Sequence, residues 1–250
     1  MLNVWLYSLI SVFIISIVSL IGVFTLSIKP DKLKKVLIYF IAFSAGALIG
    51  DAFIHLLPEV VKENGFTIAI SIYLITGIGF SLVTEKIIHW RHCHHPTTKE
   101  HVHPLTTMNL VGDSVHNFID GIIIAAAYLV SIPLGIATSI AVIFHEIPQE
   151  ISDFGVLVYG GYTKRKALLA NFLIALTSVL GAIITLIIGT SSKSILIFLI
   201  PFAAGNFIYI ASSDLIPELH KHPKFKTSLM QIIFFILGIL VMIGLLFLEF

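Results

Sequence analysis

Two stretches of the chain combine imidazole, carboxylate and carboxamide side chains within segments that are otherwise apolar. The first runs from Asp113 to Gly121 and the second from His145 to Asp153. An ionisable side chain at the centre of a bilayer costs about 3 kcal/mol or more, so such residues usually serve an ion pathway or a proton relay. The function should therefore be sought in these two stretches.

Each stretch gathers its polar side chains on one face of a helix. Positions i, i+3, i+4 and i+7 of the first are Asp113, His116, Asn117 and Asp120. Positions i, i+1, i+4, i+5 and i+8 of the second are His145, Glu146, Gln149, Glu150 and Asp153. Residues at these spacings share a face. Pro148 also breaks the local hydrogen-bond ladder and can free a backbone carbonyl towards the second stripe.

The two stripes also match in depth. Pro133 lies in the short hairpin between them, with Asp120 13 residues before it and Glu146 13 residues after it. At about 1.5 Å per residue both lie roughly 20 Å below the turn, slightly past the middle of a ~30 Å hydrocarbon core. Asp113 and Asp153 are each 20 residues from Pro133, near the inner surface. The spacing predicts a polar lane from mid-membrane to the cytoplasm.

A divalent metal ion fits this lane best. The five carboxylates of the two stripes would repel one another in a low-dielectric lane, and a cation removes that repulsion. Mixed imidazole and carboxylate ligands suit Zn²⁺, Fe²⁺ and Mn²⁺, and there is no thiolate to favour Cu⁺. A proton relay remains the chief alternative, because chains of Asp, Glu and His also carry protons. Residues that merely hold helices together would be expected to be Ser, Thr and Asn.

The composition is that of an integral membrane protein. Hydrophobic residues make up 57% and charged residues 12% of the 250, whereas a soluble domain has about 45–50% and 25%. The net charge of +1 gives no basic surface for nucleic acid. The single cysteine, Cys93, excludes an intramolecular disulfide.

We predict an all-α integral membrane protein with eight transmembrane helices, since about 20 apolar residues span the hydrocarbon core. The spans lie near residues 4–28, 36–58, 66–90, 106–130, 134–159, 166–189, 194–217 and 228–249. Of the 15 Lys and Arg residues, 13 fall in the odd-numbered loops. The positive-inside rule then places both termini on the extracellular or periplasmic side of a cell (plasma or inner) membrane.

An internal repeat links the second span to the seventh. The run from Ile41 to Gly46 is followed, nine residues after its glycine, by the start of His-Leu-Leu-Pro-Glu, which ends at Glu59. Ile200 to Gly205 is followed at the same distance by Asp-Leu-Ile-Pro-Glu, ending at Glu218. The two spans cross in opposite directions, so the repeat is inverted, as in many secondary transporters.

Histidines are concentrated in the predicted cytoplasmic loop 91–105. They are His92, His94, His95, His101 and His103, with Cys93 among them. Such a segment can bind Zn²⁺ loosely or sense it. Its spacing fits no fixed structural zinc motif, so a solvated loop of biased composition stays open as the alternative.

These features resemble the ZIP (Zrt-, Irt-like) family of divalent-metal transporters. The resemblance rests on the eight spans, on the run from His116 to Gly121 and on the run from His145 to Glu150. It extends over essentially the whole chain, including Gly50–Glu59 and Gly205–Glu218. It is closest to the branch whose fifth span carries His-Glu-x-Pro-His-Glu-x-Gly-Asp.

The resemblance implies one ZIP-like transmembrane domain, 1–250, that moves Zn²⁺, or Fe²⁺, Mn²⁺ or Cd²⁺, into the cytoplasm. The metal would be the substrate, with no catalytic cofactor. The expected partners are divalent metal ions and the lipid bilayer, with no nucleic acid and with a homodimer left open. Spans 1, 4, 5 and 6 would move as a unit against spans 2, 3, 7 and 8.

The resemblance also implies a binuclear site between the fourth and fifth spans. The first metal would be held by His116, Asp120 and His145. The second would be held by Asn117 and Glu146. His55 would be a gating or auxiliary ligand, and we expect the ion to leave past Asp113 and Asp153.

Two residues depart from the branch signature. Gln149 replaces its second histidine and Ser152 replaces its glycine. Because a carboxamide is a weaker donor than imidazole, the first site should bind more weakly or prefer Mn²⁺ or Fe²⁺. Alternatively, Glu150 supplies the missing ligand.

Two other functions could use the same polar residues. A proton or other cation channel would use the same fold without a binuclear site. An intramembrane metalloprotease is suggested by His145-Glu146-x-x-Gln149, one residue from the His-Glu-x-x-His zinc motif. Gln149 spoils its second ligand and Pro148 kinks the motif, so we do not expect an enzyme.

Overall fold

The computed structural model describes residues 2–22, 30–90, 104–159, 161–191, 194–221 and 224–248, and these are almost wholly helical. Eight helical segments are long and apolar enough to cross a membrane, which confirms the predicted number of spans. They are Leu2–Ile21, Val36–Lys62, Ile68–Ile87, Asn109–Val130, Ile132–Val158, Lys164–Gly189, Ile195–His220 and Phe225–Leu245. The histidines of the predicted loop 91–105 lie outside the described residues.

Several spans are built from more than one helical element. The elements are α1 (Leu2–Val18), η1 (Ser19–Ile21), α3 (Pro30–Gly50), η2 (Asp51–Leu56), α4 (Leu57–Asn64), α5 (Ile68–Trp90), α6 (Pro104–Val130), α7 (Ile132–Tyr159), α8 (Lys164–Ala175), α9 (Thr177–Ser191), α10 (Ser194–Tyr209), η3 (Ile210–Leu215), α11 (Ile216–His220), α12 (Phe225–Leu245) and η4 (Leu246–Leu248). The second span joins α3, η2 and α4, and the seventh joins α10, η3 and α11.

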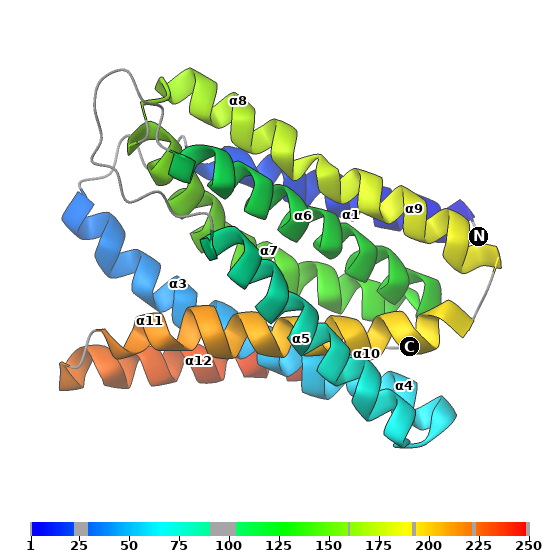
Figure 1. Ribbon diagram of the computed structural model, residues 1–250. Helices are drawn as coiled ribbons and strands as arrows, with labels where there is room; N and C mark the ends of the chain where they lie inside the picture. The colour runs from blue at the N-terminus through cyan, green and yellow to red at the C-terminus, as the bar shows by residue number, and fades with distance from the viewer. Residues whose placement is uncertain are drawn as a thin grey trace.

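The helices form two groups that pack side by side (Figure 1). One group comprises α1, α6, α7, α8 and α9, and the other comprises α3, α5, α10 and α12. The groups meet where α3 packs on α7 and where α10 packs on α6. This is the division of spans 1, 4, 5 and 6 from spans 2, 3, 7 and 8 that the resemblance implies.

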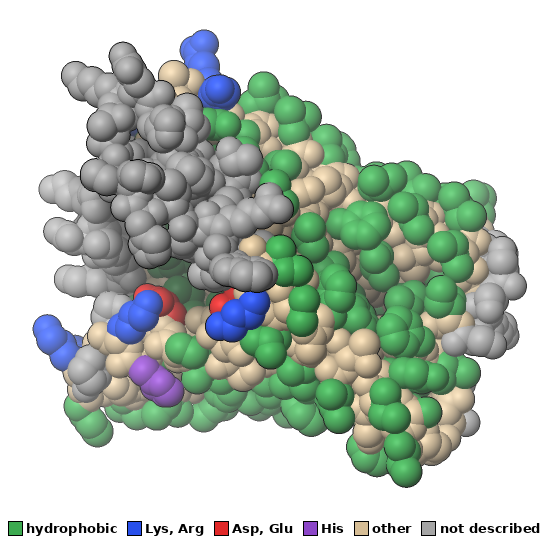
Figure 2. Space-filling model, in the orientation of Figure 1, with side chains coloured by type: hydrophobic (Ala, Val, Ile, Leu, Met, Phe, Trp, Pro, Cys, Tyr) green, Lys and Arg blue, Asp and Glu red, His purple; other side chains and the backbone are tan. Residues whose placement is uncertain are grey.

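The surface of this bundle is largely hydrophobic, with Lys and Arg side chains towards one end (Figure 2). We call it the basic end; α8 and α12 begin there. Exposed Lys164, Arg165, Lys166, Lys221, Lys224 and Lys226 belong to it. It is the end that the loop charges predict to be cytoplasmic.

The internal repeat is visible as two π-helical turns at equivalent positions. In η2 the Leu57 N–H bonds the Ala52 carbonyl, and in η3 the Ile216 N–H bonds the Ala211 carbonyl. Each π-helical segment ends two residues before a proline, Pro58 or Pro217, which cannot donate the next α-helical hydrogen bond. Because α3 and α10 run in opposite directions (Figure 1), the two copies are inverted.

Glycines let the helices of the second group approach closely. A Cβ on Gly46 of α3 would lie 2.0 Å from the Phe235 carbonyl oxygen of α12. At the repeat-related place, a Cβ on Gly205 of α10 would lie 2.1 Å from the Leu74 carbonyl oxygen of α5. These two helix pairs therefore pack backbone to backbone, as small residues allow in membranes.

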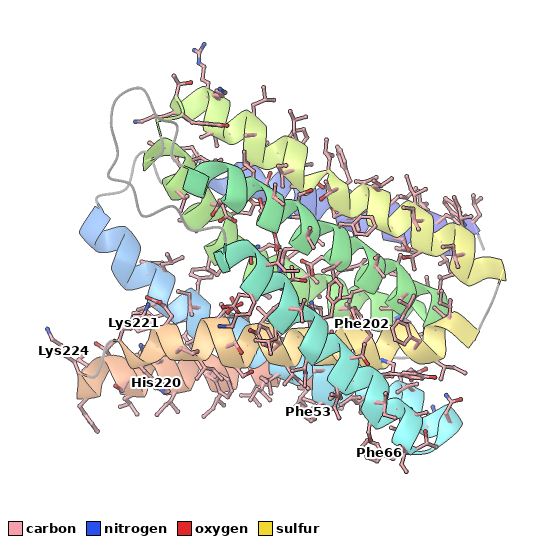
Figure 3. The ribbon with its side chains drawn as sticks, viewed as in Figure 1. Phe53, Phe66, Phe202, His220, Lys221 and Lys224 are labelled. Carbon is pink, nitrogen blue, oxygen red and sulfur yellow. The ribbon has the colours of Figure 1, made fainter. Side chains whose placement is uncertain are left out.

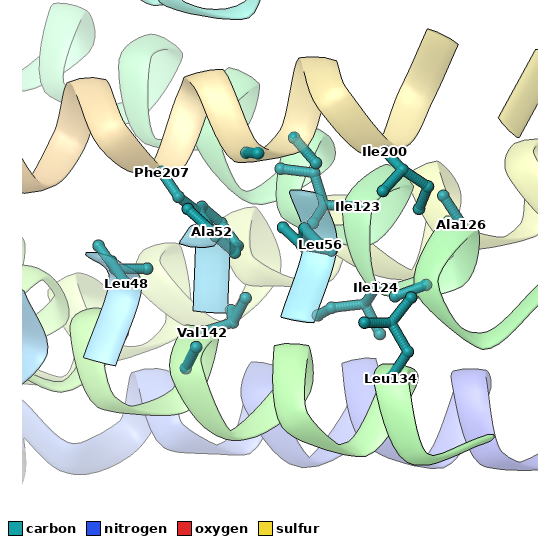
Figure 4. Packing of buried hydrophobic residues seen from close by; sticks show 14 of the residues in the cluster. Leu48, Ala52, Leu56, Ile123, Ile124, Ala126, Leu134, Val142, Ile200 and Phe207 are labelled. Atoms are coloured by element: carbon teal, nitrogen blue, oxygen red, sulfur yellow. The ribbon is translucent and has the colours of Figure 1, made fainter. Parts of the chain in front are cut away.

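A core of buried hydrophobic side chains packs between the helices of the two groups (Figure 4). Its fully buried members include Leu56, Ile123, Ile124, Leu134 and Ile200, which we call the outer plug. Ile123 and Ile124 follow Asp120 along α6 towards the hairpin at Ser131. The plug thus lies on the hairpin side of the polar stripes.

Candidate metal centre

Four metal-ligating side chains converge between α6 and α7. His116 and Asp120 come from α6, one helical turn apart, and His145 and Glu146 are neighbours on α7. One donor atom from each lies within 4.8 Å of all the others, and among the described residues no other such group of His, Cys, Asp and Glu occurs. The matching depths of Asp120 and Glu146 predicted this meeting.

The distances within this cluster suit a single tetrahedral ion. His116 Nε2 lies 3.1 Å from His145 Nε2, 3.2 Å from Glu146 Oε1 and 3.6 Å from Asp120 Oδ2. His145 Nε2 lies 3.2 Å from Asp120 Oδ2 and 3.4 Å from Glu146 Oε1. Atoms that bind one Zn²⁺ tetrahedrally at about 2.1 Å are themselves about 3.4 Å apart. Five of the six distances among these two imidazole nitrogens and two carboxylate oxygens therefore lie near the edge length of a zinc tetrahedron.

The cluster is buried except on one side. Asp120, His145 and Glu146 are at most 1% exposed, whereas the His116 side chain is 19% exposed. Apart from the imidazole contacts, no described residue donates a hydrogen bond to the carboxylate oxygens of Asp120 or Glu146. A buried carboxylate without a partner is costly, and a cation at the centre of the cluster would supply that partner.

The structure corrects one expectation about Pro148. Because Pro148 has no N–H, the carbonyl of Phe144 is released from the α7 ladder. That carbonyl accepts a hydrogen bond from Ser44 Oγ of α3 at 2.5 Å instead of turning towards the polar stripe. Pro148 thus ties α7 to the second span.

Asn117 and Asp113 form a pair one turn nearer the basic end. Asn117 Nδ2 donates to Asp113 Oδ1 at 2.8 Å and to the Asp113 backbone carbonyl at 3.2 Å. Asn117 is fully buried, and neither its Oδ1 nor Asp113 Oδ2 has a hydrogen-bond partner among the described residues. Both oxygens are available as hard ligands.

Gln149 and Glu150 lie outside the four-residue cluster. The side chain of Gln149 faces Asp113. Glu150 Oε2 accepts a hydrogen bond from Asn171 Nδ2 of α8 at 3.0 Å, which turns it towards the sixth span. The alternative in which Glu150 replaces the missing histidine therefore gains no support, because Glu146 is the fourth donor.

Two other expected site residues also lie apart from the cluster. Buried His55 donates from Nε2 to the Met242 carbonyl of α12 at 2.8 Å. Asp153 is 9% exposed and its Oδ2 has no hydrogen-bond partner among the described residues. His92, His94, His95, His101 and His103 fall outside the residues that the structure describes.

A polar cleft of about 200 Å³ reaches the cluster at its exposed member, His116. It lies between α5, α6, α7 and the seventh span, and sequence reasoning did not identify it. Its polar lining comprises Ser81, Thr84, Glu85, His116, Gln149, Asn206, Tyr209 and Asp214. Ser81 donates to Asn206 Oδ1 at 2.5 Å and the Tyr209 hydroxyl donates to Glu85.

Sequence reasoning also missed Ser44 and Asn171, which hold α7 in place. Asn171 is the only carboxamide in its apolar span, and that isolation is a usable signal. Ser44 carries no such signal, because serine is an ordinary small residue in membrane helices.

Comparison with known proteins decides the family. The chain matches the family described as ZIP Zinc transporter over residues 2–107 and 92–246. The chain belongs to the ZIP zinc transporter family. The resemblance inferred from the two polar stretches is thereby confirmed. A member of this family is a metal-ion transporter of the membrane and not an enzyme, which removes the protease alternative.

Individual ZIP relatives are similar over most of their length. The chain is 29% identical to "Zinc transporter zipt-7.1" of Caenorhabditis briggsae, over 95% of this chain and 78% of the relative. It is 28% identical to "Zinc transporter ZIP13" of Mus musculus, over 97% and 80% respectively. It is 29% identical to "Zinc transporter YKE4" of Saccharomyces cerevisiae, over 86% and 72%.

Proposed function

We propose that this ZIP protein carries Zn²⁺ into the cytoplasm through the His116, Asp120, His145 and Glu146 cluster. The observation that supports this most directly is the spacing of the four donor atoms, 3.1–3.6 Å over five of their six pairs. A proton relay needs only a chain of hydrogen bonds, whereas four donors around one point suit a cation. The similar proteins from Caenorhabditis briggsae, Mus musculus and Saccharomyces cerevisiae are named zinc transporters, which supports zinc as the substrate.

A second ion would bind one turn nearer the basic end, with Glu146 shared between the two ions. Asn117 Oδ1 and Asp113 Oδ2 supply unpaired buried oxygens there. The carboxylates of Asp113, Glu146 and Asp153 lie close enough to Glu150 for like-charge repulsion, which a second cation relieves. This position has oxygen ligands only, so it suits harder ions than the first position does.

The polar cleft would be the cytoplasmic mouth of the pathway. It meets the cluster at His116, and it lies on the side of the cluster towards the basic end. The outer plug closes the opposite side with side chains that are at most 2% exposed. We therefore interpret the structure as an inward-open arrangement of a plasma-membrane or inner-membrane importer.

Access from outside requires the outer plug to separate. The plug draws Ile123, Ile124 and Leu134 from the α6 and α7 group and Leu56 and Ile200 from the other group. Because it spans the boundary between the groups, movement of one group against the other would open it. Such alternating access at a central site is common among secondary transporters.

Metal binding to the purified protein tests the binuclear site. Wild-type protein in detergent should bind two Cd²⁺ or Zn²⁺ ions per chain in isothermal titration calorimetry. Asn117→Ala should bind one, because it removes a ligand from the second position only, and His116→Ala should lose the tighter ion. If the wild-type protein bound one metal ion per chain, and Asn117→Ala bound one as well, this result would contradict a second metal position.

A further inference from the structure

A second cavity lies far from the metal pathway, between the ends of the seventh and eighth spans. Its volume is about 500 Å³. It is lined by Ile216, Leu219, His220, Ser228, Gln231, Ile232 and Phe235. The floor is mainly apolar, and Gln231, 5% exposed, fastens the two helices by donating to the Leu219 carbonyl at 3.2 Å. We call this cavity the α11–α12 groove.

The groove is shallower than one bilayer leaflet. It runs from His220, at the basic end, to Phe235, and its lining residues on α12 extend from Ser228 to Phe235. Seven helical residues rise about 10 Å, which fits within the ~15 Å half-thickness of the hydrocarbon core. Along this face Ile232 is 56% exposed, as expected for a residue that faces lipid.

The mouth of the groove is basic. His220, Lys221 and Lys224 lie together at this end of the molecule (Figure 3). Lys224 is the N-cap of α12, and its backbone carbonyl accepts a hydrogen bond from the Ser228 N–H at 2.9 Å, which keeps it next to the groove. Lys221 is already paired with Glu218 at 2.5 Å. His220 and Lys224 are therefore the groups best placed to meet an anion above the groove.

We propose that the α11–α12 groove binds one anionic phospholipid from the leaflet at the basic end. An acyl chain would lie against Leu219, Ile232 and Phe235, while the phosphate would meet Lys224 and His220. Ser228, one turn below Lys224, would offer a hydroxyl to the glycerol ester oxygens. Basic pockets between membrane helices are suited to lipid head groups, and each surface lysine adds about 1 kcal/mol to that attraction.

Lys226 provides a matched control for Lys224. It is an exposed lysine in the first turn of α12, two residues before Ser228, so it lies on the face of the helix opposite to that groove residue. Lipid retention can be measured by native mass spectrometry on protein exposed to mixed phosphatidylglycerol and phosphatidylcholine. Wild-type protein should retain phosphatidylglycerol preferentially, at about one molecule per chain. Lys224→Gln should weaken that retention about fivefold, the equivalent of one lysine at the surface, and Lys226→Gln should not.

Further variants and a soluble competitor distinguish a bound phospholipid from other occupants of the groove. Ser228→Trp should exclude both lipids, because its side chain fills the groove below the head group, and thermal unfolding checks that this variant is folded. Glycerol phosphate, which offers the phosphate without acyl chains, should not displace the lipid. Equal retention of the two lipids, or equal losses in Lys224→Gln and Lys226→Gln, would overturn the proposal. A disulfide that links two chains of the Ser228→Cys variant would also overturn the proposal, because a second copy of the protein would then occupy the groove.

Discussion

At the scale of single residues, Gln149 is where this chain departs most from the metal-binding pattern it resembles. Its carboxamide lines the polar cleft and faces Asp113, while the four donors of the cluster form a complete set without it. The four-residue cluster therefore does not depend on the missing histidine. Gln149 instead lines the cleft together with His116.

Gln149→His should raise the preference for Zn²⁺ over Mn²⁺. Imidazole is a better donor to Zn²⁺ than a carboxamide, and Mn²⁺ gains less from the exchange. We expect a change of about tenfold in the ratio of Zn²⁺ to Mn²⁺ influx, the lower end of what a partner near a metal site contributes. Gln231→His makes the same substitution away from the pathway, so an equal shift there would rule out this explanation.

At the scale of helices, Pro148 and Ser44 act as one unit. Pro148→Ala would restore an N–H to α7 and return the Phe144 carbonyl to the helix, leaving Ser44 without its partner on α7. We expect Ser44→Ala to cost about 1 kcal/mol in the wild type and clearly less in the Pro148→Ala background. Thermal unfolding of the four proteins measures this coupling. Additive effects would show that the Ser44 hydrogen bond does not depend on the proline.

The glycines of α5 allow an equally local test of close helix packing. A Cβ on Gly77 would lie 2.1 Å from the Phe202 carbonyl oxygen, whereas a Cβ on Gly79 would meet nothing within 4 Å. Gly77→Ala should cost about 1–3 kcal/mol through overpacking. Gly79→Ala should be neutral or slightly stabilising, because alanine favours the helix. If the two variants melted at the same temperature, α5 and α10 would not approach as described.

Helix-level features were predicted from sequence to different degrees. The eight spans and the meeting of Asp120 with Glu146 follow from hydropathy and from counting residues away from Pro133. The partner of the Phe144 carbonyl could not be predicted, because Ser44 is 100 residues away and reaches α7 only through tertiary packing. The orientation of Glu150 could not be predicted for the same reason. Its position in the stripe suggested a metal ligand, but its carboxylate accepts a hydrogen bond from Asn171 of another helix.

At the scale of the whole molecule, the surroundings of the four-residue cluster differ between its two sides. The polar cleft meets the cluster at His116, whereas the buried side chains of the outer plug lie on the hairpin side. Sequence alone predicted a polar lane past Asp113 and Asp153, which are buried at 5% and 9% exposure, but it did not predict the cleft. The cleft depends on how the α5 and α10 pair sits against α6, and no pattern within a single helix encodes that arrangement.

Cysteine labelling tests both the open side and the orientation of the chain. In a Cys93→Ser background, Thr84→Cys in the cleft should react with a membrane-impermeant thiol reagent only from the cytoplasmic side. Ala126→Cys, which is fully buried in the core, should react from neither side. Reaction of Thr84→Cys from the outside would reverse the assigned orientation.

Zinc influx into proteoliposomes tests the central claim most directly. Purified protein, wild type or Glu146→Ala, would be reconstituted and supplied with Zn²⁺, Mn²⁺, Fe²⁺ or Cd²⁺, with Glu218→Gln at the basic end as control. We predict saturable Zn²⁺ influx in the wild type and the control, and its loss in Glu146→Ala, because that variant removes one of four donors and leaves an incomplete cluster. Wild-type rate and metal ranking in folded Glu146→Ala would contradict passage of the ion through this cluster.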